Sequence, residues 1–486
     1  TGGSVPHGDQ EVVLSLERMN SVQRIDPVAG VLYCQAGCGL EELQSRARDD
    51  DANLLLPLDL GAKGTCQIGG NLSTNAGGQY YYRYGSLAAN VVGLQVVLPN
   101  ERGQVLNLNF ATTTPPEGDD DDDDDDQNDD NTNHPTTTPP PPRVHSNLKD
   151  NTGYKLHQLF IGAEGTLGVI TGVALKCPPY PASRQAAFLG CRTLDQVVRL
   201  MALARRELGE IVAAVEWMDR ACLECVVQQQ QQRRRAKSSS SFQLPISMRS
   251  DNDDGTQPYP HSILLETHGS DEAHDMEKLD RFLTRAMTTT TEDADDSGQP
   301  SSPIVDNGVV AQDLRQLQAF WEIREMANPA VSSLGYGYKY DLSLPVEEFD
   351  SFGARIQQHI QQELKQQQGR QQDGNNNDEL PSLLCTNWGH LLDGNLHLNF
   401  TTPGKFELDP NVVECLEPFV FDQVTKLGGS ISAEHGIGQS KRNLLTRVHE
   451  PAVLEAMRNL KRVFDPAAIL NPSKVLPDDD DDDESV

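Results

Sequence analysis

The chain has 486 residues, which is enough for two or three domains with cores of their own. Its formal net charge is −32, but acidic runs at 119–126, 129–130 and 478–484 supply much of it and are typical of solvated, disordered segments. No basic patch is interleaved with aromatic residues, which excludes a nucleic-acid partner, and no apolar run approaches the ~20 residues of a membrane span.

The first fifty residues predict a turn, a strand and a helix. Gly2, Gly3 and Ser4 indicate a turn with free backbone N–H groups, a candidate phosphate contact. Residues 11–16 predict a strand, and residues 39–50 predict a helix with one apolar face. Because the sequence starts inside this glycine-rich phrase, we expect a targeting peptide and the first elements of the fold to lie outside it.

A long glycine-rich stretch follows, from Pro57 to Gly78. Six glycines fall among small hydroxyl and amide residues, and positive charges are few. The stretch matches neither the Walker phosphate loop nor the dinucleotide motif GxGxxG, because both fix the spacing of glycines before a helix. Its backbone could lie against a flat polar ligand, with N–H groups meeting a pyrophosphate or a ring edge. A plain cluster of glycine turns is the alternative, but the length and glycine density favour a ligand.

The remainder of the first domain, expected at 1–176, contains a hairpin and an insertion. Residues 91–98 and 104–108 are predicted to pair as strands. The Thr, Asp and Pro tract at 111–146 predicts a disordered insertion. A second glycine-punctuated stretch, Ile161 to Thr171, runs into a strand, and the domain boundary is placed near Cys177. The nine cysteines of the whole chain are scattered, and their odd number predicts reduced, mostly buried thiols in an intracellular compartment.

Beyond the boundary, the pattern predicts an α+β sheet domain at 177–409, with low-complexity insertions at 228–241, 288–302 and 365–378. Strands are expected at 262–267 and 338–344, and helices at 194–206, 271–285, 311–326 and 352–364. Helices at 410–426 and 451–464 make a C-terminal helical segment, 410–477, before an acidic tail at 478–486.

A β-hairpin with two histidines is the first candidate site. Asp393-Gly394 between alternating apolar residues is a strong hairpin signal. With a two-residue turn, His390 lies directly opposite His397, and Asn399 shares their face. Two imidazoles on one rigid ribbon suit zinc and related divalent metals. A pair of histidines on a half-exposed strand is the alternative.

A glycine-flanked loop from Ser432 to Gly438 is the second candidate site. The glycines around Glu434 and His435 are typical of a loop whose backbone must come close to a ligand. Glu434 would complete a His-His-Glu metal set with one position open, as catalytic metals require. His435 would remain as a general base, because an imidazole titrates near neutral pH. An ordinary surface pair of charged residues is the alternative.

Five phrases of the sequence, at 57–78, 147–171, 338–345, 389–399 and 432–438, together resemble the flavin-dependent D-2-hydroxyacid dehydrogenases. That family has the vanillyl-alcohol-oxidase-type FAD-binding fold. The resemblance spans nearly the whole chain outside the low-complexity tracts. It implies an α+β protein with an FAD-binding domain of that type, an α+β substrate (cap) domain and C-terminal helices, with disordered low-complexity insertions.

The resemblance also implies the cofactors and the site residues. FAD and a divalent metal, zinc in the first place, would be bound. His390, His397 and Glu434 would be the metal ligands, and His435 would be the base. The residues expected to bind substrate are Arg324, Asn328, Lys339 and Asn399. The residues expected to contact FAD are Gly2, Gly3, Ser4, Pro57, Asp59, Gly61, Gly64, Thr65, Gly69, Gly70, Asn75, Gly77, Gly78, Glu164, Gly165, Thr166, Gly168 and Ile170.

The implied reaction is the oxidation of a D-2-hydroxy acid, with D-2-hydroxyglutarate first and D-lactate or glycolate as alternatives. A guanidinium and an ammonium from neighbouring elements, Arg324 and Lys339, are what a dicarboxylate needs. The resemblance further implies electron-transfer flavoprotein as acceptor and the mitochondrial matrix as compartment, and it allows a homodimer.

The sequence departs from the family pattern in three places. Asn328 stands where the pattern has threonine, and Pro329 would disturb a helix there. Most of the first glycine loop of the flavin domain also falls outside the sequence. Two other classes stay open: a zinc hydrolase, which would leave 57–78 unexplained and has no HExxH helix here, and a non-catalytic relative that does not hold FAD.

Overall fold

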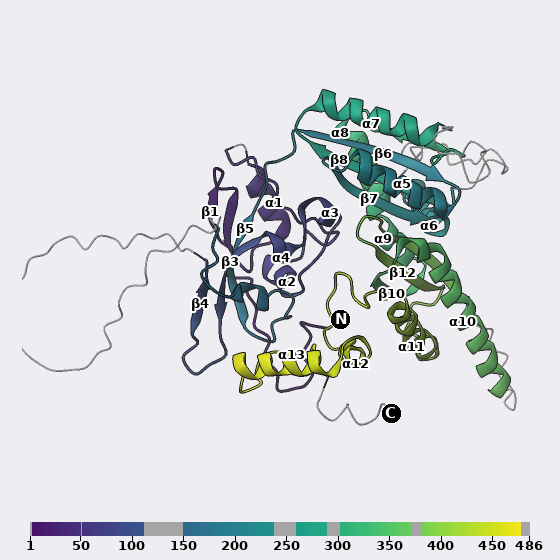
Figure 1. Cartoon of the computed structure of the whole chain (residues 1–486). Helices are drawn as coiled ribbons and strands as arrows, with labels where there is room; N and C mark the ends of the chain where they lie inside the picture. The colour runs from purple at the N-terminus through teal and green to yellow at the C-terminus, as the bar shows by residue number, and fades with distance from the viewer. Residues whose placement is uncertain are drawn as a thin grey trace, which may run out of the picture.

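The computed structural model describes residues 2–49, 51–110, 149–237, 259–288, 302–371 and 382–477, apart from the side chains of 234–237 and 367–371. The insertion expected at 111–146, nearly all of that expected at 288–302, and the acidic tail lie outside these residues. The described chain forms two sheets with helices around them (Figure 1).

The N-terminal half folds around a five-stranded antiparallel sheet in the order β1-β2-β5-β3-β4. Its core is built from apolar residues of β2, β3 and β5 and of the short helices between them. The strands are β1 (Val22–Asp26), β2 (Val31–Gln35), β3 (Val91–Val97), β4 (Val105–Leu108) and β5 (Val169–Lys176). The helices are α1 (Leu40–Arg48), α2 (Ile68–Ser73), α3 (Tyr81–Tyr84), α4 (Leu87–Asn90) and the 3-10 turn η1 (Leu156–Leu159).

Most of the local predictions for this half are confirmed. The helix expected at 39–50 is α1, which buries Leu40, Leu43 and Ala47, and the expected hairpin is β3–β4. The strand expected at 11–16 is wrong: Val12, Val13 and Leu14 are 92%, 67% and 66% exposed and have no neighbouring strand. Strand propensity alone does not make a strand where no partner is available. The first strands are β1 and β2, which had not been predicted.

The C-terminal half folds around a seven-stranded antiparallel sheet in the order β10-β12-β11-β7-β8-β6-β9. Its strands are β6 (Ser183–Cys191), β7 (Val212–Asp219), β8 (His261–Gly269), β9 (Asn307–Val310), β10 (Gly335–Ser343), β11 (Leu384–His390) and β12 (Asn395–Pro403). Helices α5 (Leu194–Glu207), α7 (Glu272–Met287), α10 (Phe349–Gln371) and α11 (Pro410–Lys426) contribute to the core on one face. Helices α6 (Arg220–Lys237), α8 (Leu314–Glu325) and α9 (Ala327–Ser332) cover the other face.

Two predicted insertions are corrected by the helices that run into them. The tract at 228–241 continues α6 as far as Lys237, and the tract at 365–378 continues α10 as far as Gln371. Gln, Arg and Lys are good helix formers, and a tract that extends an existing helix avoids the cost of nucleation. The helices expected at 194–206, 271–285, 311–326, 352–364, 410–426 and 451–464 and the strands expected at 262–267 and 338–344 are confirmed.

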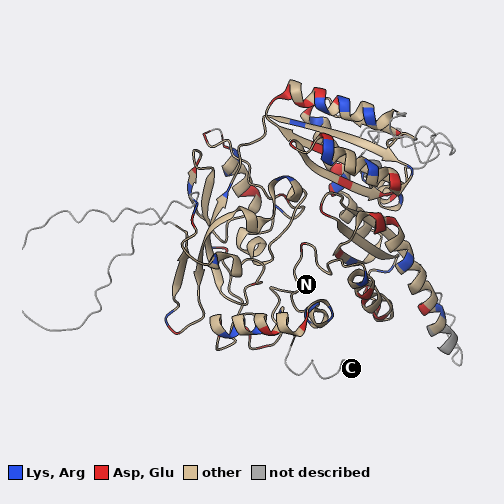
Figure 2. Ribbon diagram, in the orientation of Figure 1, with Lys and Arg blue, Asp and Glu red and all other residues tan. Residues whose placement is uncertain are grey.

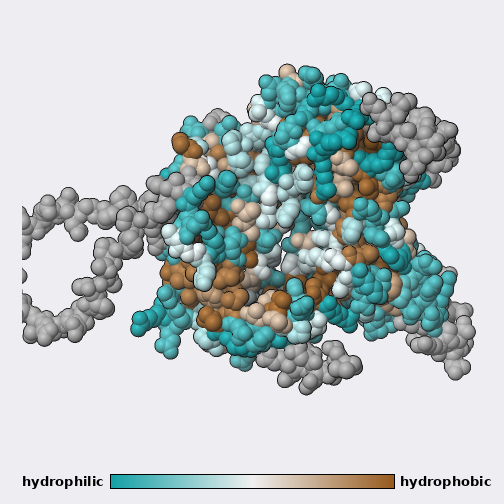
Figure 3. Space-filling view, viewed as in Figure 1, coloured by the Kyte–Doolittle hydropathy of each residue, from teal (hydrophilic) through white to brown (hydrophobic). Residues whose placement is uncertain are grey.

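The end of the chain returns to the five-stranded sheet. After α11 come a loop, the 3-10 turn η4 (Arg442–Leu444), α12 (Leu445–Val448) and α13 (Pro451–Phe464), and α13 lies beneath that sheet in Figure 1. The ring of Phe464 meets that of Phe160 edge-on at 5.2 Å, and Lys461 Nζ donates to the carbonyl of Thr166 at 2.9 Å. Hydrophobic residues gather just above α13 in Figure 3, and the first and last parts of the chain therefore share one core.

Charged residues of both signs occur along the helices around the seven-stranded sheet (Figure 2). All nine cysteines lie within the described residues and are free thiols, and all except Cys66 and Cys385 are buried, as predicted. In the part of the chain that the structure describes, no helix is long and apolar enough to cross a membrane.

Candidate active site

The predicted histidine hairpin forms, but its register differs from the prediction. His390 lies opposite Asn395, and His397 lies opposite Trp388, so the two histidines are not directly opposed. The connection has four residues rather than two, because the N–H of Leu391 leaves the hairpin and bonds to the carbonyl of Val215 on β7 at 2.9 Å. A slip of two residues keeps side chains on the same face of a strand. The two imidazoles therefore still meet, with ring centroids 5.7 Å apart.

The loop after α11 brings a carboxylate to these histidines. Ligand atoms of His390, His397 and Glu434 all lie within 4.8 Å of one another. Two imidazoles and one carboxylate that converge in this way are a donor set that fits a catalytic divalent metal such as zinc. The structure thus brings together the three residues that the sequence singled out as metal ligands.

Glu216 on β7 connects this cluster to the end of α8. Its side chain is 1% exposed, with Oε1 3.0 Å from Nδ1 of His390 and Oε2 2.7 Å from Nε of Arg324. Burial raises the pKa of Glu216, but His390 and Arg324 outweigh it and hold that pKa at about 2. Burial likewise lowers the pKa of His390, and Glu216 outweighs it and raises that pKa to about 9. With Nδ1 held by Glu216, Nε2 is the nitrogen of His390 that is free to bind a metal.

The second histidine and the acid differ in their electrostatics. Burial, followed by the charges of His390 and Arg324, lowers the pKa of His397 to about 3. Burial raises the pKa of Glu434 to about 7. A neutral imidazole with an available lone pair is the form in which histidine binds a metal.

Asp341 on β10 holds the loop that carries Glu434 and His435. Its Oδ2 accepts hydrogen bonds from the backbone N–H groups of these two residues at 2.7 and 3.0 Å. Its Oδ1 accepts from the amide of Asn395 at 2.9 Å, and Nδ1 of His397 and Nδ1 of His435 lie 3.8 and 3.7 Å from its oxygens. Asp341 is 3% exposed, whereas the side chain of His435 is 62% exposed and in reach of water.

The four residues expected to bind substrate lie on neighbouring elements beside the cluster. Lys339 and Asn399 are directly opposed on β10 and β12. Lys339 Nζ donates to Oδ1 of Asn328 at 2.8 Å, and burial lowers the pKa of Lys339. The side-chain amide of Asn399 donates to the carbonyl of His397 at 3.1 Å. Arg324 lies in the last turn of α8, which ends at Glu325. The next helix, α9, begins at Ala327 and contains Pro329. The helix break expected at Pro329 thus falls just ahead of it.

The glycine-rich stretch passes against the acid of the cluster. A Cβ on Gly77 would lie 2.8 Å from Oε1 of Glu434, so any larger residue would displace the Glu434 side chain from its present position. Elsewhere in the stretch the glycines serve packing: a Cβ on Gly78 would lie 2.5 Å from the carbonyl of Asp59, and one on Gly69 would lie 2.9 Å from Ala36. Gly61 and Gly70 have open space around the Cβ position.

The remaining residues expected at FAD reach the same loop from other directions. Glu164 is 6% exposed, and its carboxylate accepts hydrogen bonds from the N–H groups of Ile437 and Gly438 at 2.6 and 2.9 Å. Gly2 packs against Gln439, whose amide donates to the carbonyl of Val5 at 2.6 Å. The N-terminal turn, the glycine-rich stretch and the second glycine stretch therefore all converge on residues 434–439.

The other predicted FAD contacts occupy turns and packing positions. Thr65 and Thr166 donate through their hydroxyls to the carbonyls of Ala62 and Ala163 at 3.2 and 2.7 Å. A Cβ on Gly168 would lie 2.6 Å from Val96, and Ile170 is 4% exposed in the core. Pro57 lines a small cavity with Gly77 and Gly78.

Sequence reasoning missed Glu216 and Asp341. Asp341 had a usable signal, since it shares the polar face of an alternating strand with Lys339. Glu216 had no usable sequence signal, because it lies in β7, a strand whose residues are almost all buried, far from the other site residues in sequence.

Family models and relatives agree on the class of protein. The model described as "FAD binding domain" matches residues 1–109, and the model "FAD linked oxidases, C-terminal domain" matches residues 180–475. The mitochondrial D-2-hydroxyglutarate dehydrogenase of Danio rerio is 38% identical over 477 residues, covering 98% of this chain and 72% of that protein. The enzyme of the same name from Rattus norvegicus is 37% identical over 476 residues, covering 98% and 71%. The D-2-hydroxyglutarate–pyruvate transhydrogenase of Saccharomyces cerevisiae is 34% identical over 475 residues, covering 98% and 79%.

Solved structures agree on the fold. The 4-ethylphenol oxidase of Gulosibacter chungangensis matches with a TM-score of 0.57 at 14% identity, covering 95% of this chain and 80% of that one. An alkyldihydroxyacetonephosphate synthase matches with a TM-score of 0.56 at 14% identity, covering 94% of this chain and 66% of that one. The expected α+β fold with an FAD-binding domain of the vanillyl-alcohol-oxidase type is confirmed.

An FAD-binding domain joined to an FAD-linked oxidase domain defines a flavin-dependent oxidoreductase. The similarity to the dehydrogenases extends over 98% of the chain. The chain belongs to the family of FAD-dependent D-2-hydroxyacid dehydrogenases.

Proposed function

We propose that this enzyme oxidises D-2-hydroxyglutarate to 2-oxoglutarate, with D-lactate as the second candidate substrate. The relatives named above are D-2-hydroxyglutarate enzymes, and they share about a third or more of their residues with this chain over nearly its full length. The observation that carries the proposal is the meeting of His390, His397 and Glu434 beside Gly77, where the two halves of the molecule face each other.

The residues around the cluster fit both bound groups that the reaction needs. His390, His397 and Glu434 would hold a divalent metal, zinc in the first place, and the glycine backbone at Gly77 and Gly78 would border FAD. When bound, FAD supplies a hydride acceptor and the metal supplies a Lewis acid for the substrate hydroxyl.

His435 would accept the proton of the 2-hydroxyl. A ring nitrogen of His435 lies within 4.8 Å of a carboxylate oxygen of Glu434, so the imidazole borders the cluster. Asp341 orients the loop through two backbone hydrogen bonds and lies 3.7 Å from Nδ1 of His435. Because the side chain of His435 is 62% exposed, it can pass the proton on to water.

Arg324 and Lys339 would bind the two carboxylates of the substrate. Arg324 is fixed by Glu216, which uses Nε and leaves other N–H donors of the guanidinium for a ligand. Lys339 is held by Asn328 and Ser332 at 2.8 and 2.9 Å, so its ammonium is already directed. Asn328 thus acts through Lys339, and Asn399, opposite Lys339 in the sheet, borders the same space.

The compartment, the acceptor and the assembly are further parts of the proposal. Several relatives carry the word mitochondrial in their names, which supports the mitochondrial matrix. Electron-transfer flavoprotein would reoxidise the flavin, and a homodimer is the assembly we expect. The name of the yeast relative supports pyruvate as an alternative acceptor.

A substrate panel on FAD-loaded protein tests the function. Under anaerobic conditions, D-2-hydroxyglutarate should bleach the flavin absorption, D-lactate should do so more slowly, and the L enantiomer should not. Dialysis against a chelator should abolish the bleaching, and added zinc should restore it. Protein that binds FAD but is bleached by no D-2-hydroxy acid would contradict the proposal. Adding electron-transfer flavoprotein or pyruvate to the reduced enzyme then separates the two acceptors.

A further inference from the structure

A second buried carboxylate, Glu266 on β8, collects five hydrogen bonds. Its side chain is 0% exposed. Oε1 accepts from Nε and Nη2 of Arg184 at 2.9 and 2.6 Å and from Nε2 of His268 at 3.0 Å. Oε2 accepts from the hydroxyl of Tyr80 at 3.0 Å and from Nε1 of Trp321 at 2.8 Å. A fully buried carboxylate with this many donors is held in one position.

The two donors on Oε2 come from different halves of the molecule. Tyr80 follows Gly77 by three residues and belongs to the glycine-rich side. Trp321 lies on α8, one helical turn before Arg324. Their rings also contact each other edge-on at 6.2 Å. Glu266 therefore joins the segment that borders Glu434 to the helix that carries the proposed substrate-binding arginine.

Glu266 and Glu216 lie on the same face of the seven-stranded sheet. In the pairing of β7 with β8, Ala214 lies opposite Glu266 and Glu216 lies opposite Leu264, so the two carboxylates are diagonal neighbours. Helix α8 packs on this face. Glu266 holds Trp321 and Glu216 holds Arg324, so the helix is fixed at two points one turn apart.

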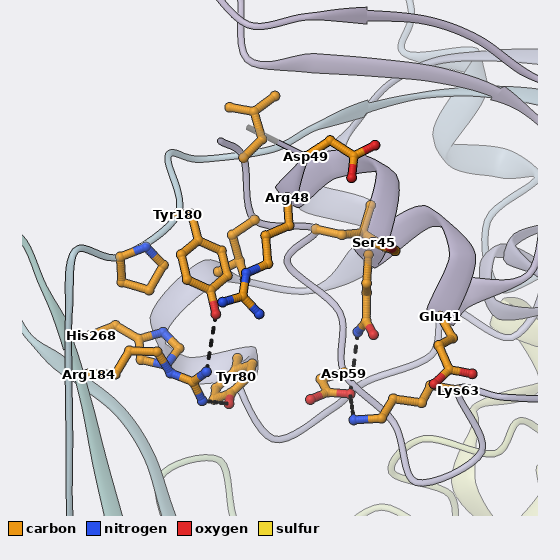
Figure 4. A pocket seen from close by; sticks show the side chains of 15 residues that line it. Glu41, Ser45, Arg48, Asp49, Asp59, Lys63, Tyr80, Tyr180, Arg184 and His268 are labelled. Atoms are coloured by element: carbon orange, nitrogen blue, oxygen red, sulfur yellow. Dashed lines mark hydrogen bonds and ion pairs between the residues drawn. The ribbon is translucent and has the colours of Figure 1, made fainter. Parts of the chain in front are cut away.

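The space next to this network is not filled by side chains. A cavity of about 600 Å³ lies between α1 and the 54–63 segment on one side and Arg184 and His268 on the other. Figure 4 shows Arg184 reaching across its floor to Tyr80 and upward to Tyr180. Beside the cavity, Tyr80 and Trp321 pack in one apolar cluster, and the bonds to Glu266 and the contact of Tyr84 with His268 at 2.7 Å join the two halves there.

We propose that Glu266 is a positioning residue for substrate oxidation: through Tyr80 it places the glycine wall at Gly77, and through Trp321 it places Arg324. The inference rests on the proposed function for the role of Arg324. The effects of the two hydrogen bonds should be separable. The bond from Trp321 affects the binding of the substrate carboxylate, and the bond from Tyr80 affects the geometry of the bound flavin.

Two conservative variants test the two effects separately, since each removes one hydrogen-bond donor to Glu266. Trp321→Phe should raise KM for D-2-hydroxyglutarate and the Kd of 2-oxoglutarate about tenfold, with kcat changed little. Tyr80→Phe should leave both nearly unchanged, while it shifts the visible spectrum of bound FAD and slows flavin reduction several-fold. Glu266→Gln should combine the two effects.

Matched controls remove similar groups elsewhere. Trp217→Phe deletes an indole N–H bonded to His261 in the buried core, and Tyr81→Phe deletes an exposed hydroxyl next to Tyr80. Both should keep the KM and the flavin spectrum of the unmodified enzyme. If Trp321→Phe raises KM no more than Trp217→Phe does, and Tyr80→Phe matches Tyr81→Phe, Glu266 has a structural role only and the inference is overturned.

Binding of 2-oxoglutarate, followed by flavin difference spectra, needs no turnover. An unmodified enzyme that binds this product but oxidises no hydroxy acid would refute the proposed function while the Kd values still test the positioning role. Active enzyme with unchanged Trp321→Phe and Tyr80→Phe variants would refute the positioning role alone.

Discussion

Replacing Glu216 by glutamine should weaken metal binding at the His390, His397 and Glu434 cluster by about 10–100-fold. Glu216 accepts a hydrogen bond from Arg324 and forms an ion pair with Nδ1 of His390 at 3.0 Å, and a neutral amide cannot replace it toward both partners. If the amide oxygen of the glutamine keeps the hydrogen bond from Arg324, the amide nitrogen faces Nδ1 of His390. This nitrogen is a donor, so Nδ1 must then be the unprotonated nitrogen that accepts the hydrogen bond. The proton of His390 then moves to Nε2, which is the nitrogen needed for the metal.

The structure also gives the stability cost of this change. The pKa of Glu216 is about 2 in the folded chain against an ordinary 4.5, which corresponds to about 3 kcal/mol of stabilisation of the ionised form. Removal of one partner from a buried ion pair typically costs about 3–5 kcal/mol, in agreement with this figure. We therefore expect Glu216→Gln to fold, since a chain of this size buries a large core, but to unfold at a lower urea concentration.

Zinc content after equilibrium dialysis, measured over a series of free zinc concentrations, is the assay. Glu224→Gln on the exposed side of α6 is the matched control and should bind zinc as the unmodified chain does. A folded Glu216→Gln variant that retains the full zinc affinity would refute the reasoning. If KM for the hydroxy acid rises while the zinc affinity is unchanged, Glu216 positions Arg324 for the substrate but does not orient His390 for the metal.

Three further outcomes follow from the geometry. His435→Asn should slow anaerobic flavin reduction by about 10²–10⁴-fold in stopped-flow experiments, and a rate near that of the unmodified enzyme would remove His435 from the role of base. Gly77→Ala places a methyl group 2.8 Å from Oε1 of Glu434 and should lower zinc affinity, whereas Gly8→Ala, with nothing within 4 Å, should not; equal zinc titrations of the two would contradict the contact. Burial raises the pKa of Glu266, but His268 and Arg184 outweigh it and lower that pKa to about 2, so its stabilisation is full above about pH 4.5 and is lost as the pH falls toward 2. The difference in urea midpoint between the unmodified chain and Glu266→Gln should therefore shrink between pH 6 and pH 3, and a constant difference would argue against an ionised Glu266.

The hairpin shows which part of a site the sequence can predict. Alternation along β11 and β12 placed His390 and His397 on one face, and that assignment holds because the side-chain period of a strand is two. The register was wrong because it depends on Val215, which takes the N–H of Leu391 from another strand. Local pattern therefore identified the face, while a neighbour distant in sequence decided the pairing.

The low-complexity tracts show a related limit. Composition marked residues 228–241 and 365–378 as low-complexity insertions, yet both tracts begin as helix. For the first tract, composition did not reveal the helix α6 ahead of it. For the second, the preceding helix α10 was predicted, but its continuation into the tract, which costs little once a helix has formed, was not. Conversely, the apolar run at 11–16 has residues typical of a strand but no neighbouring strand to pair with, and it does not form one.

The sequence by itself determined most of the longer helices, most of the strands, the glycine-rich stretches and the residue types of the site, because these depend on periodicity, propensity and spacing over short distances. Only the tertiary structure decided that Glu434 lies against Gly77, that Asp341 holds the loop of His435, and that Glu216 and Glu266 share one face of a sheet. Each of these contacts joins residues from distant parts of the chain. Their positions follow from the pairing of strands and the packing of the two halves, which local patterns do not encode.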